Sequence, residues 1–495
     1  MAIAVVYSRA LVGIEPQIIT IEIHLSPGLP AFNIVGLPEK AVKESRERVR
    51  SALMSNGFSM PAKRITVNLA PADLPKEGGR YDLPIAVGLL VTTGVIRSEA
   101  IERCVFVGEL GLKGDLRKVK GSLPMAISSR SDSTIMILPE ANKKEVEMVQ
   151  GLSCFVFHHL MELVCHFLGT SKKEALSYCS QPQKTLISFD MRDVIGHDVI
   201  KRALEVAACG GHSLLMQGPP GSGKSMLAKR FSGILPKLTM AESVEVGAIY
   251  SLSSHGFQAS NWMQRPFRQP HHGSSAVALV GGGSHPQPGE ISLAHKGVLF
   301  LDELLEFPRH VIESLREPME NGEISISRAN RFVKFPAEFQ LVAAMNPCPC
   351  GYLTDKEKEC TCSSDAISKY QRKLSGPMVD RIDLFVEVPR QILQKIIVSG
   401  DGESSASIAR RVERVRQAQI TRQGKLNSKL TQSDIKNQGW LGAEEEGFLI
   451  LAAEKFKLSA RACFKVLRVA RTVADMEGME KIQRFHIQEA LAWRR

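Results

Sequence analysis

The first third of the chain alternates between apolar and polar residues in short runs. Ile18–Ile23 and Ile65–Leu69 place an apolar side chain at every second position, which is the pattern of a half-buried β-strand. Between them, Lys40–Met54 repeats its apolar residues at helical spacing. The pattern predicts an α+β domain over residues 1–168.

The rest of the chain changes its pattern twice. A polar stretch over residues 169–190 predicts a linker. In residues 191–390, short apolar runs alternate with helical patterns, which predicts a parallel sheet connected by helices. Residues 391–495 are helical in pattern throughout. We therefore expect a multidomain α/β protein with an α+β N-terminal domain, a parallel-sheet core and an all-α C-terminal region.

Neither a membrane span nor a secretory signal is predicted. The longest weakly polar run, Leu83–Ile96, is too short to cross a bilayer. The first 25 residues alternate like a strand and lack an apolar signal core and a cleavage site. We expect a cytoplasmic protein that has no membrane partner and whose 10 cysteines are reduced.

One motif predicts a nucleotide site. The pattern G-x-x-x-x-G-K-[ST] is met completely by residues that follow the apolar run His212–Gln217 and precede the helical pattern Met226–Ile234. The glycines let backbone N–H groups approach phosphates, and the helix dipole favours their charge. We expect Lys224 to reach the β- and γ-phosphates of ATP and Ser225 to bind Mg²⁺. The residues expected to bind the nucleotide are Gly218, Pro219, Pro220, Gly221, Ser222, Gly223, Lys224 and Ser225.

Two further apolar runs end in polar side chains. Gly297–Leu301 leads into Asp302 and Glu303, which favours a metal-binding Asp, again for Mg²⁺, and a Glu that polarises the attacking water. Phe339–Met345 leads into Asn346, whose amide could orient water, with an Asn-Pro turn as the alternative. Together with the phosphate loop, these residues predict a catalytic site for ATP hydrolysis.

Four of the cysteines fall within 15 residues: Cys348, Cys350, Cys360 and Cys362. Two close pairs can meet around one tetrahedral Zn²⁺, which prefers thiolate ligands. Because the cluster follows Asn346 directly, we predict a structural zinc ion that fixes the loop beside the catalytic strand. Four reduced structural thiols are the alternative.

The charge of the chain is a weak signal for nucleic acid. The net charge is +11, but much of the excess lies after residue 391, where 19 basic side chains face 12 acidic ones. A more specific signal is Glu323–Lys334, whose two alternating arms predict a β-hairpin with Arg328, Asn330 and Arg331 near its tip. Such a tip would bind DNA through its phosphates, without sequence preference. A solvated hairpin is the alternative.

Several blocks of the second half, taken in order, resemble AAA+ ATPases of the magnesium-chelatase-like ComM/YifB family. The resemblance covers essentially the whole chain and implies a hexameric ring that hydrolyses ATP. It further implies a DNA helicase that promotes branch migration on single-stranded or branched DNA during homologous recombination and natural transformation, with recombination proteins as further partners. The blocks are Arg265–His272 (RPFRQPHH), Pro288–His295 (PGEISLAH), Gly297–Leu304, Asn346–Gly351 (NPCPCG) and Ser375–Asp383 (SGPMVDRID).

The resemblance also assigns roles that the residues alone do not. Arg381 matches the arginine finger that reaches a neighbour's γ-phosphate, with an ion pair to Asp380 or Asp383 as the alternative. Arg461 matches the sensor 2 arginine of a C-terminal lid, and Asn346 matches sensor 1. The long segment before Gly297 resembles a helix-2 insert, and the hairpin matches the pre-sensor 1 hairpin.

The N-terminal domain resembles the Lon protease domain over residues 65–90 and 108–123. Lon-type proteases use a Ser–Lys dyad, in which the amine activates the hydroxyl. Here Arg80 stands at the serine position and, in an ungapped match, Leu123 stands at the lysine position. Lys118 or Lys120 could take the lysine position only if the register is shifted. We expect no peptidase activity and a structural or DNA-contacting role for this domain.

Three other functions compete with a DNA motor. One is a remodelling subunit similar to the magnesium chelatase motor, which shares the ATPase core. The second is an ATP-dependent protease, which the replaced dyad disfavours. The third is a DNA-binding scaffold that does not translocate, which the full set of ATPase residues disfavours.

Overall fold

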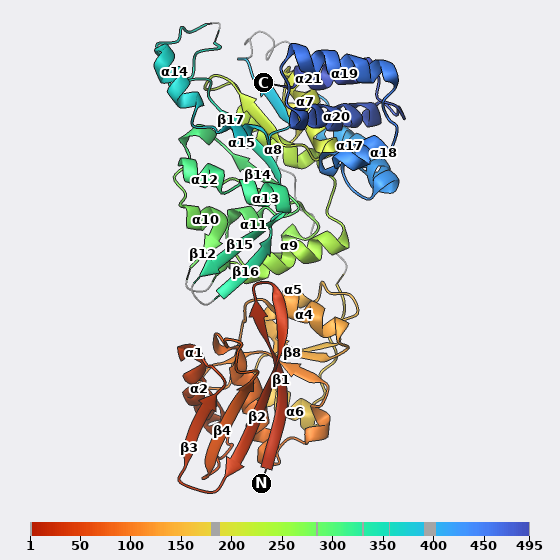
Figure 1. Cartoon of the computed structure of the whole chain (residues 1–495). Coiled ribbons are helices and arrows are strands. Elements are labelled where there is room, and N and C mark those ends of the chain that lie inside the picture. Colours follow the sequence, from red (N-terminus) through yellow and green to blue (C-terminus); the bar gives the residue numbers. More distant parts are fainter. Residues whose placement is uncertain are drawn as a thin grey trace. The chain divides into compact units, whose positions relative to one another are not determined.

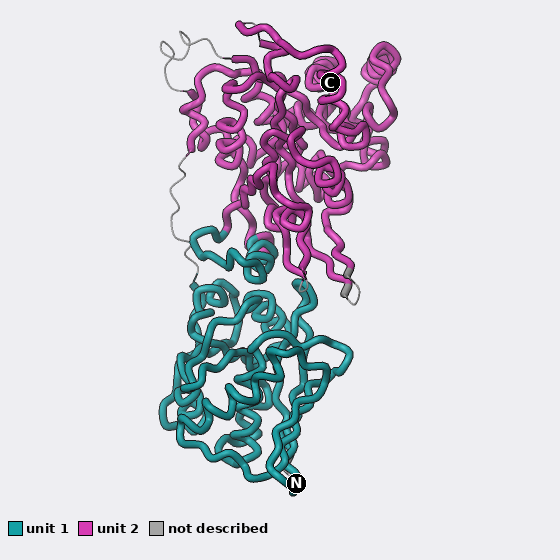
Figure 2. The backbone as a smooth tube through the Cα atoms, turned by 90° about the vertical axis from the view of Figure 1, so that its left-hand side faces the viewer, with its two compact units in different colours: residues 1–184, 243–262 teal, residues 185–242, 263–495 magenta. Residues whose placement is uncertain are grey.

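The computed structural model describes residues 2–179, 189–283, 286–328, 331–355, 357–390 and 402–494 (Figure 1). The chain forms two compact units (Figure 2). The first combines Met1–Lys184 with Ser243–Trp262, and the second combines Thr185–Glu242 with Met263–Arg495. The chain therefore leaves the second unit to contribute a segment to the first and then returns.

The first unit contains a seven-stranded mixed sheet in the order β3-β4-β2-β1-β5-β8-β9. Its longest pairing is antiparallel, between β1 (Ala2–Val12) and β2 (Glu15–Ser26), and the four strands from β1 to β9 in this order are parallel. In β2 the alternating residues Ile19, Ile21 and Ile23 are fully buried. The remaining strands are β3 (Ala31–Val35), β4 (Arg64–Ala70), β5 (Cys104–Phe106), β8 (Ile135–Pro139) and β9 (Cys154–Phe157).

Helices of the first unit complete its core. The predicted helix over residues 40–54 is present but interrupted at Glu44, which separates α1 (Lys40–Lys43) from α2 (Ser45–Ser55). A continuous apolar run forms α3 (Asp82–Thr92), in which nine successive residues from Asp82 are buried. The other helices are α4 (Ser122–Ser131), α5 (Lys143–Val146) and α6 (Leu160–Leu168). The α+β character expected from the sequence is confirmed.

Part of the predicted linker is bound to this unit. The N–H of Leu176 donates to the carbonyl of Cys154 at 2.8 Å, and the N–H of Cys179 donates to the carbonyl of Glu147 at 2.9 Å. Residues 180–188 lie outside the described part of the chain. The three-domain division with its boundaries stays a prediction.

The segment that the first unit takes from later in the sequence packs on Leu123, the residue expected at the protease lysine position. Helix α9 (Met240–Leu252) brings Gly247 so close to α4 that a Cβ on it would lie 2.6 Å from Cδ2 of Leu123. The carbonyl of Ser251 accepts the N–H of Gly121 at 3.0 Å. Leu123 is fully buried as a result.

The second unit contains a five-stranded sheet in the order β11-β14-β17-β10-β18, and each neighbouring pair is parallel. This confirms the predicted parallel core. Short apolar strands buried on both faces are typical of such a sheet, and β14 and β17 have no exposed residue. The strands are β10 (Leu214–Gln217), β11 (Phe267–Arg268), β14 (Val298–Leu301), β17 (Gln340–Met345) and β18 (Leu384–Glu387).

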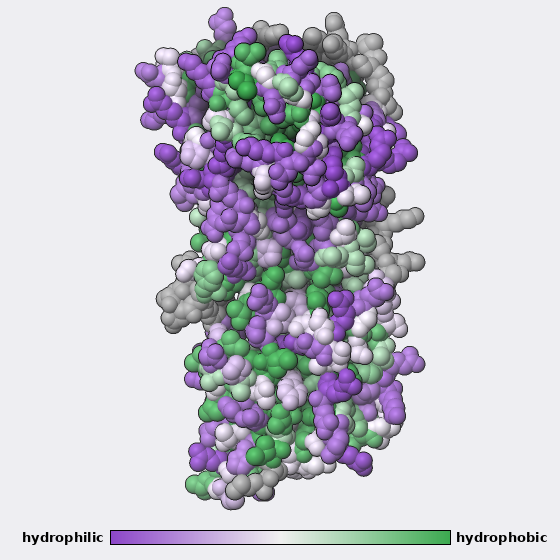
Figure 3. All heavy atoms as spheres, turned by 45° about the vertical axis from the view of Figure 1, so that its right-hand side comes forward, coloured by the Kyte–Doolittle hydropathy of each residue, from purple (hydrophilic) through white to green (hydrophobic). Residues whose placement is uncertain are grey.

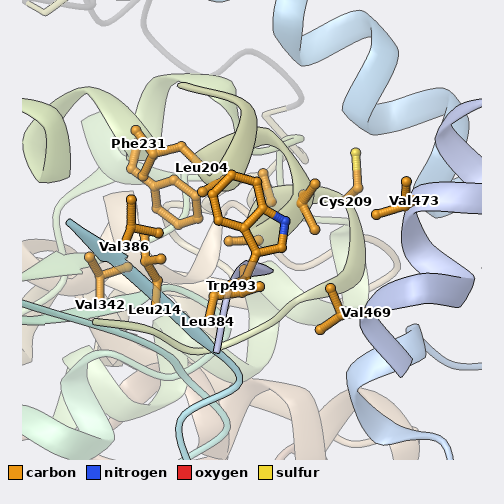
Figure 4. Close-up of a cluster of buried hydrophobic side chains, with 14 of the residues drawn as sticks. Leu204, Cys209, Leu214, Phe231, Val342, Leu384, Val386, Val469, Val473 and Trp493 are labelled. Carbon is orange, nitrogen blue, oxygen red and sulfur yellow. The ribbon is translucent and has the colours of Figure 1, made fainter. Parts of the chain in front are cut away.

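The described C-terminal residues form helices, as predicted. Three of these helices have a side-chain cap at their N-terminus: Ser404 caps α17, Thr431 caps α18 and Ser459 caps α20. Each capping side chain accepts a backbone N–H. Figure 4 shows Val469, Val473 and Trp493 in one buried cluster with residues of α7 (Asp198–Gly210) and of the sheet. The helices are α17 (Ser405–Gln423), α18 (Gln432–Asn437), α20 (Ala460–Met476), α19 (Ala443–Lys455) and α21 (Arg484–Ala492).

The surface differs between the units. In Figure 3, hydrophobic side chains are more frequent on the visible face of the first unit than on that of the C-terminal helices. On β1, Ile3 is 65% exposed and Val5 44% exposed. No helix in the described ranges is long and apolar enough to cross a membrane.

Candidate active site and metal centre

The predicted ATPase residues meet at one edge of the parallel sheet. Because the five strands are parallel, their carboxyl ends share this edge. There β14 leads into Asp302 and Glu303, β17 leads into Asn346, and β10 leads into the phosphate loop, residues 218–225. This is the edge at which open parallel sheets bind their ligands.

The phosphate loop places Lys224 among oxygen atoms. Helix α8 (Lys224–Phe231) begins at this residue, after Gly223 at φ +90°. The Lys224 ammonium donates to the carbonyls of Gly218 at 2.7 Å and Pro219 at 2.9 Å, and to Oδ1 of Asn346 at 3.3 Å. Burial lowers the pKa of Lys224, an effect that the charges of Asp302 and its neighbouring carboxylate oppose.

The two residues expected to hold Mg²⁺ are in direct contact. Oγ of Ser225 donates to Oδ2 of Asp302 at 2.6 Å. A hydroxyl and a carboxylate are oxygen ligands of the kind that Mg²⁺ prefers, and a magnesium ion usually binds few protein groups beside phosphates and water. The residues present therefore fit a magnesium–nucleotide site.

Glu303 has a strained backbone and an unforeseen partner. Its φ of +51° lies in the left-handed region, which costs a residue with a Cβ roughly 1–2 kcal/mol. Its carboxylate lies 3.2 Å from Nδ1 of His272, which follows β11. We did not assign His272 from the sequence, although it lies in the block Arg265–His272 that carries the family resemblance.

Arg381 lies at the opposite edge of the sheet. Its carbonyl accepts the hydroxyl of Ser213 at 2.8 Å, and Ser213 directly precedes β10. The phosphate loop follows the other end of that strand. Arg381 is therefore separated by the length of β10, about 13 Å for four residues, from the loop of its own chain.

Both predicted nucleotide-sensing arginines pair with one carboxylate. Glu320, on α13 (Arg316–Asn321), forms an ion pair with Arg381, and its Oε1 lies 3.0 Å from the guanidinium of Arg461. Hydrogen bonding from Arg381 lowers the pKa of Glu320. Asp383, one of the two alternatives named for Arg381, instead accepts the N–H of Ser213 at 3.1 Å. The sequence contains no signal that would have identified Glu320.

The four cysteines form one cluster. Their Sγ atoms all lie within 4.8 Å of one another, and Sγ of Cys348 lies 3.4 Å from that of Cys350 and 3.6 Å from that of Cys360. A zinc ion with four sulfur ligands at about 2.3 Å needs sulfur–sulfur distances of about 3.8 Å, so the cluster fits the ion. A backbone hydrogen bond from Tyr352 lowers the pKa of the Cys350 thiol, whereas the pKa values of Cys360 and Cys362 are raised in the same cluster. The fit to zinc therefore rests on the geometry of the four sulfur atoms.

The predicted DNA-binding hairpin is present. Strands β15 (Glu323–Arg328) and β16 (Arg331–Pro336) are antiparallel, and Arg328 pairs with Arg331 in register. Asn330 and the side chains of these two arginines lie outside the described residues. Their contact with DNA stays a prediction.

A cavity of about 410 Å³ lies beside the segment that leads into α7. Its lining combines apolar residues with charged ones of α7: Val194, Ile195, Gly196, Ile408, Asp198, Lys201, Arg202 and Glu205. His197, which follows Gly196, is 8% exposed, and its Nε2 lies 3.8 Å from the place of a Cβ on Gly223 of the phosphate loop. The volume of this cavity lies in the range of small-molecule sites. The sequence motifs did not reveal it.

Comparison with known proteins assigns the chain to a family. Family models of the ChlI subunit of magnesium chelatase match residues 21–142, 190–396 and 402–494. Competence protein ComM of Haemophilus influenzae is 46% identical over 100% of this chain and 98% of its own length, and the uncharacterised protein YifB of Escherichia coli is 45% identical over 100% and 97%. The magnesium-chelatase 67 kDa subunit of Chlorobaculum parvum is 28% identical over 31% of this chain and 23% of its own length. The chain therefore belongs to the ChlI-like magnesium chelatase family of AAA ATPases, in the group that includes ComM and YifB.

Proposed function

We propose that the protein is a ring-forming ATPase that moves on single-stranded or branched DNA. The observation that supports it best is the distribution of its polar residues. Lys224, Ser225, Asp302 and Asn346 converge at one edge of the sheet, whereas Arg381 joins Glu320 away from them. One chain thus carries one part of a site at each edge.

Each residue at the first edge has a role in hydrolysis. Lys224 exchanges its carbonyl contacts for oxygens of the β- and γ-phosphates. Ser225 and Asp302 would hold Mg²⁺, which when bound would neutralise charge at the phosphates. Glu303 takes a proton from the attacking water, and Asn346 orients that water. The cavity beside Gly196 has room for the nucleobase.

The second edge completes the site of a neighbouring subunit. Arg381 is too far from its own phosphate loop to reach a γ-phosphate bound there, because β10 lies between them. Arg461 shares Glu320 with it, so both arginines belong to the same edge. In a head-to-tail ring, such an edge faces the nucleotide of the next copy. We propose that both arginines stabilise charge on the neighbour's phosphates, and that the ring is a hexamer.

DNA is the proposed track. The relative ComM is named a competence protein, which supports a role in the handling of transforming DNA, and the hairpin β15–β16 carries two arginines at its described end. We propose branch migration during recombination as the activity. The test is the ATPase rate with and without four-way DNA, beside unwinding of the same DNA. Stimulation with unwinding is expected; absence of DNA binding would favour a protein-remodelling role.

The remodelling role is the second candidate. The similarity to a magnesium-chelatase subunit over 159 residues supports it. Peptidase activity is not expected, because Leu123 is buried beneath α9 and Arg80 lies against Met125, with an N–S distance of 3.9 Å. If the protein cleaved casein, and if a substitution in this domain abolished the cleavage, the expected lack of peptidase activity would be wrong.

We propose that Cys348, Cys350, Cys360 and Cys362 hold one structural zinc ion per chain. Metal analysis of the purified protein should find about one zinc per chain, and Cys360→Ser should lose it. Cys463 is partly buried on α20 and is not one of the four clustered cysteines, so Cys463→Ser is a suitable control and should keep the metal. Less than about half a zinc per wild-type chain would contradict the assignment.

A further inference from the structure

The cysteine cluster is in contact with the phosphate loop. Gly351 follows the second cysteine at φ +85°, and a Cβ on it would lie 2.6 Å from Cδ and 2.7 Å from Cγ of Pro220. The backbone at Gly351 therefore lies directly against the proline ring, and a side chain would displace it. Pro220 belongs to the turn whose carbonyls hold Lys224.

A second contact starts from the segment between the two cysteine pairs. Nε of Arg390, which follows β18, lies 2.9 Å from Oδ2 of Asp355. The Arg390 guanidinium also donates to the carbonyl of Pro220 at 3.4 Å and lies 5.7 Å from the ring centre of Tyr352. Arg390 thus links the segment between the two cysteine pairs to the phosphate loop.

A third contact lies just before the cluster. Oδ1 of Asn346 accepts the ammonium of Lys224 at 3.3 Å, and Cys348 is two residues further along. Between Met345 and Ser364, the described residues form neither helix nor strand. The cysteine cluster is consequently the principal cross-link available to fix this loop, since a metal bound by both pairs closes it.

We propose that metal binding by the four cysteines holds the phosphate loop in its nucleotide-binding shape, so that zinc occupancy sets the affinity for ATP. The inference rests on the proposed ATPase function and adds Gly351 and Arg390 as positioning residues. The mechanism is mechanical: the metal fixes Cys350, and the adjacent Gly351 supports the turn at Pro220.

Two variants separate metal binding from the contact. Gly351→Ala should keep about one zinc per chain but weaken binding of a fluorescent ATP analogue about tenfold or more, because its Cβ pushes Pro220 away. Cys360→Ser should lose both the zinc and the affinity. Gly439→Ala is the matched control, since Gly439 also has a positive φ, +62°, but no atom within 4 Å of the added Cβ. It should change neither zinc content nor affinity.

A test on the wild-type protein does not depend on whether a variant folds. A zinc-selective chelator, with Mg²⁺ kept in excess, should weaken analogue binding about tenfold or more, and added zinc should restore it. Unchanged affinity in Gly351→Ala or in the zinc-free protein would overturn the inference. Lys224→Ala tests the proposed function separately: if it binds the analogue like wild type, the nucleotide site itself is wrong.

Discussion

Lys224 contacts three oxygen acceptors and forms no ion pair among the described residues. These three acceptors are uncharged, so they leave the charge of the ammonium available for an incoming anion. Burial makes the charged form costly, as the lowered pKa of Lys224 indicates. Phosphate oxygens would relieve that cost. At the scale of single residues, the site is thus prepared for a polyphosphate.

Two substitutions separate binding from hydrolysis. Lys224→Ala should weaken ATP binding by about tenfold to a hundredfold, because charge-assisted hydrogen bonds are lost. Glu303→Gln should bind ATP normally but hydrolyse it about a hundredfold more slowly, because the general base is lost. Analogue titration and phosphate release measure the two effects. Normal hydrolysis by Glu303→Gln would contradict the assignment of the base.

Elements of the second unit are joined by an ion-paired carboxylate. Glu338, just before β17, lies 2.7 Å from Nζ of Lys296 and 2.9 Å from Nζ of Lys429 in the C-terminal region. Burial alone would raise the pKa of Glu338, but the hydrogen bonds from these lysines outweigh it and lower the pKa to about 2. The carboxylate therefore connects the helical region to the sheet through its charge.

The pairing predicts a pH-dependent contribution to stability. Since the folded pKa is lowered, the contribution is complete above the unfolded pKa of about 4.3 and is lost as the pH falls toward 2. Glu338→Gln should lower the free energy of unfolding by about 1 kcal/mol at neutral pH. Urea unfolding should show the difference from wild type narrowing below about pH 4.3. A difference that stays constant down to pH 3 would exclude the charge as its cause, and Glu454→Gln on α19 is the control.

The hairpin β15–β16 gives a prediction about DNA. The double variant Arg328→Ala with Arg331→Ala should lose DNA-stimulated ATP hydrolysis and keep the basal rate, because phosphate contacts are lost. Lys334→Ala, in the same hairpin but paired with Glu323 at 2.5 Å, should keep the stimulation. ATPase rates with and without forked DNA measure both. Intact stimulation in the double variant would rule out the hairpin as the DNA contact.

Elements with a strong local pattern could be predicted from the sequence, and contacts between distant segments could not. The alternation in β2 and the apolar runs of β10 and β14 are local, as is the spacing of the phosphate loop. The break at Glu44 has no breaker residue to announce it. The pairing of Glu320 with Arg381 and of His272 with Glu303 could not be predicted, because no spacing rule relates residues so far apart in the sequence.

At the scale of the whole molecule, the proposed function implies that each chain carries two partial sites. The phosphate loop and the carboxylates occupy the carboxyl edge of the sheet, and Arg381 with Arg461 lies at the other edge. Neither part is sufficient for hydrolysis if the arginines act on a neighbour. ATP hydrolysis should therefore depend on assembly, and its rate per chain should rise with protein concentration.

Mixing two inactive variants tests this claim most directly. Lys224→Ala lacks a working phosphate loop but keeps Arg381, whereas Arg381→Ala keeps the loop. After dissociation and reassembly in equal amounts, random mixing should restore hydrolysis to about a quarter of the wild-type rate, because some interfaces combine an intact loop with an intact arginine. If the mixture is no more active than the two variants alone, or if Arg381→Ala alone hydrolyses ATP like wild type, the neighbour-completed site is wrong.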